Sequence, residues 1–275
     1  MKALILTEFY KLIKQSRTYY AIGAVLLIEI IILFVAFYQG KTIIDVLLKS
    51  LQDSFYFEGT LLNGNLIIYM ILNSLWFHLP LILMIIVSGM LTVEYKDGTL
   101  QSVMLQPVSK WKFMTAKYIV AIVFTLTMVL IMAITAFVLS YGLFGKGDLV
   151  VYLNGLIFFT NEDAFIRLIE AFASGAVSMV FFSVVSLTLA VVFKEGAKTW
   201  IISALFLIIS NLFLNIDLKI EWLNRIFFAK LNDTWQFFFY SEIDWNRIYW
   251  NNFLLIVYIL IFMVVGVYIF NKKDI

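Results

Sequence analysis

The chain has 275 residues, of which 63% are hydrophobic and only 14% are charged, and its mean hydropathy is +0.97. Soluble domains average roughly 45–50% apolar and about 25% charged residues, so this composition excludes a soluble globular protein and requires lipid around much of the surface. The net charge of +2 provides no field for nucleic acid. Because the chain has no cysteine, disulfides, thiolate metal sites and cysteine catalysis are excluded as well.

Residues 1–18 predict a helix that lies in the membrane interface. Charged residues interrupt the apolar ones, whereas a cleavable signal peptide would carry an unbroken apolar run. One helical face is apolar and consists of Leu6, Phe9, Tyr10 and Ile13. The opposite face is polar and consists of Glu8, Lys11, Lys14 and Gln15. This division between two faces is typical of an interfacial amphipathic helix.

Six apolar stretches follow, each close to the length of about 20 residues that a bilayer requires. They are Tyr19–Tyr38, Leu66–Val93, Phe113–Tyr141, Leu168–Phe193, Thr199–Ile216 and Ile248–Phe270. We therefore expect an all-α membrane protein that forms a single transmembrane domain over residues 1–275. In the fourth stretch, small residues near one face predict close packing against another helix, within or between subunits.

The distribution of basic residues predicts the orientation in the membrane. The N-terminus, the second and fourth loops and the tail hold 12 of the lysines and arginines, against 8 in the longer remaining loops. Because basic residues favour the cytoplasmic side, we expect both termini in the cytoplasm of an inner-membrane protein. The long aromatic loop 217–247 then lies outside, where it serves as an anchor at the interface or as a lid over an exit path.

Two polar residues inside the spans are candidates for a transport pathway or an interface. Glu29 in the first span costs roughly 2.5 kcal/mol or more to insert, so we expect it to face the interior of the bundle or a subunit interface. Its carboxyl group either contacts substrate or a proton, or forms a hydrogen-bonded link between helices. His78 in the second span either bonds to a neighbouring helix or contacts substrate.

The sequence offers no catalytic or metal-binding constellation. A metalloprotease site needs at least two histidines and a carboxylate, and this chain has one histidine. Gly145 and Lys146 are followed by Gly147 instead of the Ser or Thr that a phosphate-binding loop requires. We therefore expect neither an enzyme nor a cofactor bound by this chain.

The loop 94–112, on the expected cytoplasmic side, carries a short amphipathic helix. Asp97 or Thr99 can cap this helix, Pro107 ends it, and Ser109 can cap the next span. Its apolar face consists of Leu100, Val103 and Met104.

This loop resembles the signature of type-2 ABC exporter permeases. In that family an acidic residue, a basic residue, Gly-Thr, a short helix and Pro-Val-Ser-basic connect the second and third spans, and a lysine follows in the third span, where Lys117 stands here. The resemblance extends over the whole chain, from the interfacial helix to the tail. It implies that the loop couples to a separate ATPase subunit through Glu94, Lys96, Asp97, Gly98, Thr99, Leu100, Val103, Met104 and Pro107.

The resemblance implies the membrane subunit of an ABC exporter. Such a permease pairs with a second copy or a related permease chain and with ATP-binding subunits. The ATP-binding subunits, and not the permease, bind ATP and Mg²⁺. The alternative is a stand-alone channel or secondary transporter, for which we would expect paired ionisable residues or broken helices at mid-membrane. Glu29 and His78 are all that the spans offer in that respect.

Overall fold

The computed structural model describes the backbone of residues 1–48, 61–153, 155–214, 216, 219 and 221–273. Six of its helices are long and apolar enough to cross a membrane, which confirms the predicted all-α membrane protein with six spans. They are α2 (Ser16–Leu48), α3 (Gly64–Lys96), α5 (Lys110–Phe144), α6 (Asn161–Phe193), α7 (Gly196–Leu214) and α10 (Trp245–Lys272). Most helices extend past the predicted apolar stretches because their polar end residues continue the backbone hydrogen-bond ladder.

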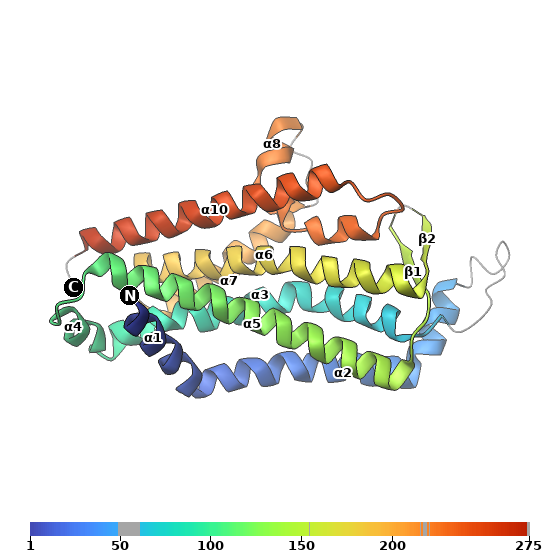
Figure 1. Cartoon of the computed structure of the whole chain (residues 1–275), viewed down its shortest axis with the longest axis horizontal. Helices are drawn as coiled ribbons and strands as arrows, with labels where there is room; N and C mark the ends of the chain where they lie inside the picture. Colours follow the sequence, from blue (N-terminus) through green and yellow to red (C-terminus); the bar gives the residue numbers. More distant parts are fainter. Residues whose placement is uncertain (49–60, 154, 215, 217–218, 220, 274–275) are drawn as a thin grey trace.

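The long helices lie side by side along one axis of the molecule (Figure 1). Both chain termini and the short helices α1 (Lys2–Lys14) and α4 (Thr99–Met104) lie at one end, which we call the termini end. A hairpin of β1 (Leu149–Tyr152) and β2 (Leu156–Phe159) lies at the other end, the hairpin end. An even number of spans is consistent with both termini lying on one side.

Helix α6 is the centre of the bundle and packs against α3, α5, α7 and α10. In its most apolar window 72% of the residues are buried, against 22% in α7 and in α10. The predicted close packing occurs at Gly175, where an added Cβ would lie only 1.7 Å from Cη2 of Trp76 on α3. Any larger side chain at Gly175 would therefore force these two helices apart.

The hairpin end differs from the loop that we expected between the third and fourth spans. An antiparallel pair, with Leu149 opposite Phe159 and Tyr152 opposite Leu156, occupies part of that segment. The side chain of Asn65 fastens this region to α3: its amide donates to Gly147 O at 2.6 Å, and it accepts from Tyr141 Oη at 2.6 Å. These bonds keep the hairpin against the bundle.

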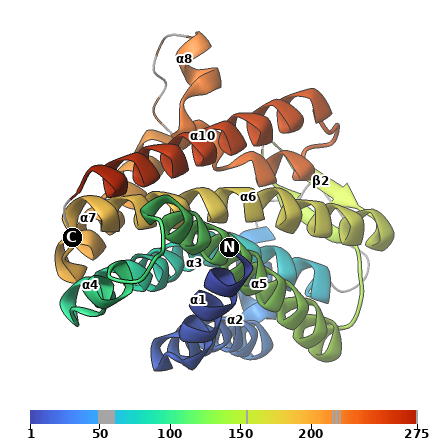
Figure 2. The ribbon, with the colours of Figure 1, turned by 60° about the vertical axis from the view of Figure 1, so that its left-hand side comes forward.

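The loop 217–247 folds into three short helical segments, although its residues 217, 218 and 220 lie outside the described residues. They are α8 (Glu221–Ile226), α9 (Phe228–Leu231) and the 3₁₀ helix η1 (Thr234–Phe239). Two views show α8 standing out from the bundle beside α10 (Figures 1 and 2). In contrast, η1 is anchored in the bundle, because Trp235 is buried with its ring centroid 5.2 Å from that of Trp76.

Candidate functional site

Helix α1 places a charged residue inside the protein at the termini end. The apolar residues Leu6, Tyr10 and Ile13 are exposed, as expected for a face that meets lipid. Glu8, which the sequence places on the polar face, is buried with 4% of its surface exposed. Lys14 on the same face is exposed, so only part of the polar face of α1 packs against the bundle.

Four charged side chains from three helices meet beside α1 and form what we call the charge ring. Lys11 Nζ lies 2.8 Å from both Glu8 Oε1 and Glu94 Oε1. Lys117 Nζ lies 2.5 Å from Glu8 Oε2 and 3.0 Å from Glu94 Oε2. Each lysine therefore bridges both carboxylates, and α1, α3 and α5 are joined through a closed and electrically neutral cycle.

Lys117 on α5 is the centre of this ring and has no exposed surface. Besides its two carboxylate partners, its ammonium group donates to Met90 O at 2.9 Å and lies 4.8 Å from the Phe113 ring centroid. A buried ammonium is tolerated only when its donors and its charge are satisfied. These contacts meet that condition, and they explain how a lysine can occupy a span so close to the membrane.

The ring favours the ionised forms of its two members on α1, Glu8 and Lys11. Burial on its own raises the pKa of Glu8, but Lys117 and Lys11 outweigh burial and hold that pKa below its usual range. Burial likewise lowers the pKa of Lys11, but the hydrogen bonds to Glu8 and Glu94 and their charges raise it above its usual range. The ion pair between Glu8 and Lys11 therefore persists across neutral pH.

Helix α4 extends from the same end, directly after the helix that carries Glu94. The turn into α4 is made by Gly98 with a φ of +68°, a left-handed conformation that favours glycine. Gly98 is the N-cap residue of α4, and no side chain caps that end, so the expected cap by Asp97 or Thr99 is not formed. Helix α4 ends at Met104, before Pro107, as predicted.

The two faces of α4 have different partners. Leu100 is buried in the chain's own core, and Val103 and Met104 pack against that core. The surface that α4 presents to the outside is instead made of Gln101, Ser102, Leu105 and Gln106, with Leu105 89% exposed. The apolar face therefore fastens α4 to the bundle, and the opposite face is left exposed.

The other residues of the predicted coupling loop divide in the same way. Glu94 is buried in the charge ring. Exposed at the surface are Lys96, Asp97, Gly98, Thr99 and Pro107. The loop thus joins an exposed polar surface directly to a buried ionic connection, although the role of its residues in coupling stays a prediction.

Glu29 and His78 do not share a site. Glu29 on α2 has no exposed surface, which confirms that it faces the interior. Neither carboxyl oxygen has a well-formed hydrogen bond among the described residues, but the Thr135 side chain on α5 interacts with the carboxyl group. A link between these helices and a contact with substrate or a proton therefore both stay predictions. His78 is exposed, and its Nδ1 lies 2.8 Å from Ser74 O of its own helix, so the expected bond to a neighbouring helix is absent from the described part of the chain.

Comparison with known proteins gives the family of this chain. The family model described as "ABC-2 family transporter protein" matches residues 4–211, which include most of α1, all of α4, the charge ring, four complete spans and most of the fifth, α7. The chain belongs to the ABC-2 transporter family. It is therefore a multi-pass membrane protein of a class whose members are the membrane components of ABC transporters.

A curated relative of this ABC-2 family chain is the "Uncharacterized protein YhcI" of Bacillus subtilis (strain 168). The two are 25% identical over 199 residues, which cover 70% of this chain and 63% of YhcI. This chain thus spans less than two thirds of the length of YhcI, whose printed description assigns no substrate.

The sequence pointed to only part of the charge ring. The family resemblance indicates Glu94 and Lys117, whereas the helical pattern places Glu8 and Lys11 only on the polar face of an interfacial helix. Their spacing of three residues was a signal, since it places an acid and a base side by side on a helix. The partners of these two side chains, 83 and 109 positions further along the chain, carry no local pattern that could reveal them.

Proposed function

We propose that this chain is the permease subunit of an ABC exporter in the cytoplasmic (inner) membrane, driven by ATP that a separate subunit hydrolyses. In the proposed topology the termini end is cytoplasmic and the hairpin end faces outward. A second permease, identical or related, completes the pathway. The ATP-binding subunits hold ATP and Mg²⁺.

One observation carries the proposal: an exposed helix at the termini end is connected directly to a buried ionic ring. A docked ATPase subunit would touch the exposed surface of α4 and of the two residues after it. This surface consists of Gln101, Ser102, Leu105 and Gln106. Movement of α4 would displace Glu94 at the end of α3, and Glu94 is bonded to Lys11 and Lys117. Because ion pairs of this geometry resist separation in a buried setting, α1, α3 and α5 would follow as one body.

The proposal is tested by co-purification of the chain with an ABC ATPase encoded by a neighbouring gene. Leu105→Asp should abolish co-purification and stimulation of ATP hydrolysis, because a charge replaces an exposed apolar contact without disturbing the chain's own packing. Tyr152→Asp is the matched control at the opposite end, where Tyr152 is 73% exposed, and should change neither readout. Unchanged co-purification of Leu105→Asp would contradict the docking role of α4.

The same preparation separates the exporter from a stand-alone channel or secondary transporter. An exporter requires the ATPase subunit and hydrolysable ATP for transport into or out of vesicles. Transport that proceeds at the same rate without the ATPase subunit would contradict the proposal.

A further inference from the structure

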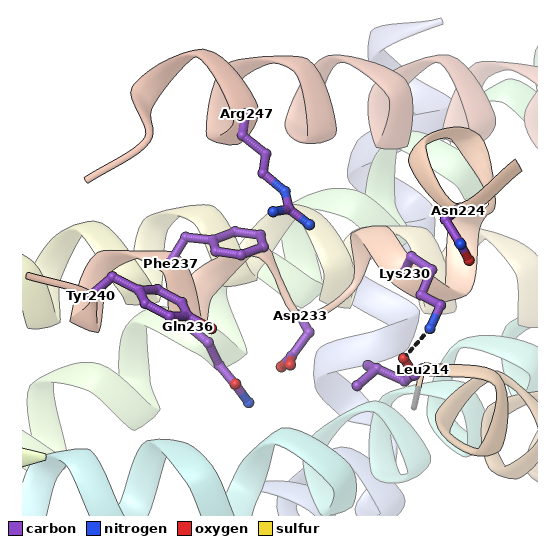
Figure 3. Close-up of a pocket in the computed structure, with 8 residues that line it drawn as sticks. All are labelled: Leu214, Asn224, Lys230, Asp233, Gln236, Phe237, Tyr240 and Arg247. Carbon is purple, nitrogen blue, oxygen red and sulfur yellow. Dashed lines mark hydrogen bonds between the residues drawn. The ribbon is translucent and has the colours of Figure 1, made fainter. Parts of the chain in front are cut away.

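A polar cavity lies between the end of the fifth span and the start of the sixth, and no residue of the charge ring lines it. The end of α7, helices α8 and α9, η1 and the start of α10 enclose a volume of about 410 Å³ (Figure 3). In the proposed topology this cavity is on the outward side. Its walls come from the segment between the fifth and sixth spans, which the sequence predicted only as an aromatic loop.

Two basic side chains and one carboxyl group line this cavity: Lys230 on α9, Arg247 on α10 and Asp233 before η1. None of them forms an ion pair with another residue in the described part of the chain. Lys230 Nζ donates one hydrogen bond, to Leu214 O at 2.5 Å, so an ammonium group with three donors keeps two for a ligand. The cavity therefore has an excess of positive charge.

An aromatic wall fixes the position of the guanidinium group. Arg247 Cζ lies 4.4 Å from the ring centroid of Phe237, which stacks on Tyr240 at 5.8 Å and an interplanar angle of 27°. A guanidinium that rests on a ring face still directs its N–H donors outward in the plane. Arg247 is thus held ready for an oxyanion, the planar group that arginine binds with two parallel hydrogen bonds.

The surroundings of the cavity are those of a membrane interface. Beside Arg247 on the first turns of α10, the large side chains of Trp245, Tyr249 and Trp250 are exposed, and Trp222 on α8 is 63% exposed. Exposed tryptophan and tyrosine concentrate at the level of lipid headgroups. The commonest oxyanion at that level is phosphate.

Asp233 is compatible with an anionic ligand in spite of its carboxyl group. Burial raises the pKa of Asp233 to about 7. Near neutral pH a large share of this side chain is therefore protonated, and a protonated carboxyl group can donate a hydrogen bond to a phosphate oxygen. Above that pH the same group becomes a repelling charge.

We propose that this cavity is a binding site for a phosphate ester, held by Lys230 and Arg247 beside Asp233. The cavity binds the phosphate of a lipid headgroup or of a soluble phosphate ester, and both present the same oxygens. The site is independent of the proposed transport function, because its occupancy needs neither ATP nor an ATPase subunit.

The test measures binding to the purified full-length chain, without an ATPase subunit, by native mass spectrometry and thermal stabilisation. The lipid probe is dihexanoyl phosphatidylglycerol, and the soluble probe is glycerophosphoglycerol, which has the same phosphodiester without acyl chains. Binding of both at similar affinity identifies a soluble phosphate ester, and binding of the lipid probe alone identifies a headgroup. Failure of both to bind overturns the proposal.

Variants assign the binding to this cavity. Lys230→Gln and Arg247→Gln should each weaken it roughly tenfold, since each removes a charged donor. Arg225→Gln is the matched control, because Arg225 is exposed on α8 and does not line the cavity. Equal loss of affinity in the control variant would show non-specific attraction and overturn the assignment.

A further variant, Asp233→Asn, tests the site through the pH dependence of binding, so the test does not depend on the folding of the other variants. The titratable and charged groups that face Asp233 are Tyr69 on α3, Lys230, Tyr240 and Arg247. Ordinary tyrosine, lysine and arginine side chains do not titrate between pH 6 and 8, and neither does a phosphodiester. The original chain should therefore lose affinity as the pH rises from 6 to 8, whereas Asp233→Asn should bind more tightly at pH 8 and show no such slope. Weaker binding by Asp233→Asn at pH 8 would mean that the carboxylate attracts a cation, which contradicts the proposal.

Discussion

Lys117 and Glu8 are 109 positions apart in the chain, yet Lys117 Nζ lies 2.5 Å from Glu8 Oε2 in a site with almost no exposed surface. This contact ties the helix at the membrane surface to a helix that crosses the membrane. Together with Lys11 and Glu94 it makes α1, α3 and α5 one mechanical unit next to α4.

Removal of Lys117 should destabilise the protein strongly. Lys117→Met leaves the buried Glu8 and Glu94 with Lys11 as the only cation remaining in the ring, and breaking a buried ion pair costs about 3 kcal/mol or more. We expect a lower melting temperature for the purified chain. The double variant Lys117→Met with Glu8→Gln should recover part of the loss, because the members of one network are not additive. A double variant that loses the full sum of both single effects would show that the two residues are not coupled.

The stability of the charge ring should depend on acid pH. The folded protein holds the pKa of Glu8 below its ordinary value of 4.5. The contribution of Glu8 is therefore fully present above pH 4.5 and is lost as the pH falls through the lower value of the folded state. Melting temperatures measured from pH 7 down to pH 3 should fall, and Glu8→Gln should have a lower melting temperature at pH 7 and a shallower decline. Identical declines in both proteins would contradict this role of Glu8.

Glu29 should contribute nothing favourable to stability. Its carboxyl group is completely buried, and no well-formed hydrogen bond satisfies it among the described residues, although the Thr135 side chain on α5 lies close by. Glu29→Leu conserves much of the volume and removes a polar group whose desolvation costs about 1–3 kcal/mol. We therefore expect an unchanged or higher melting temperature for Glu29→Leu, contrary to what a hydrogen-bonded link would give.

A transport assay on the same position then separates packing from function. Loss of transport in both Glu29→Gln and Glu29→Leu, with assembly and ATP hydrolysis retained, would assign a substrate or proton contact to the carboxyl group. A clearly lower melting temperature for Glu29→Leu would instead show that Glu29 has a stabilising partner.

Accessibility of single cysteines should report the orientation, because the chain has no cysteine of its own. Ser241→Cys lies on an exposed position of the loop before α10 and should react with an impermeant thiol reagent from outside the cell. Gln101→Cys on α4 should react only after the membrane is opened. Asn232 is 7% exposed, so Asn232→Cys should stay protected from both sides, although it belongs to the same outward segment. Labelling of Ser241→Cys from the cytoplasmic side alone would reverse the topology.

The number of spans and their approximate positions followed from the sequence, because a run of about 20 apolar residues is what a helix needs to cross the lipid bilayer. The hairpin did not follow, although Leu149–Tyr152 and Leu156–Phe159 are short β-branched and aromatic runs around a turn that contains Gly155. Its glycines suggested an irregular loop instead.

The sequence predicts the parts of the candidate site that depend on neighbouring residues. It does not predict the parts that depend on contacts between distant segments. The short helix α4 follows from its apolar spacing and from Pro107, but the same spacing does not reveal which partner its apolar face meets. Leu100 meets the chain itself, which is a tertiary outcome. The burial of Glu8 and the cavity around Lys230 and Arg247 depend in the same way on contacts between distant segments.

The central claim, that α4 is the contact surface for an ATPase subunit, is tested most directly by site-specific cross-linking. A photoreactive cross-linker is attached to Leu105→Cys in membranes that also contain the ATPase subunit. We expect a cross-linked product of the two chains from position 105, and none from the same reagent on Tyr152→Cys at the hairpin end. Absence of the product at position 105, or equal yield at position 152, would show that α4 is not the contact surface.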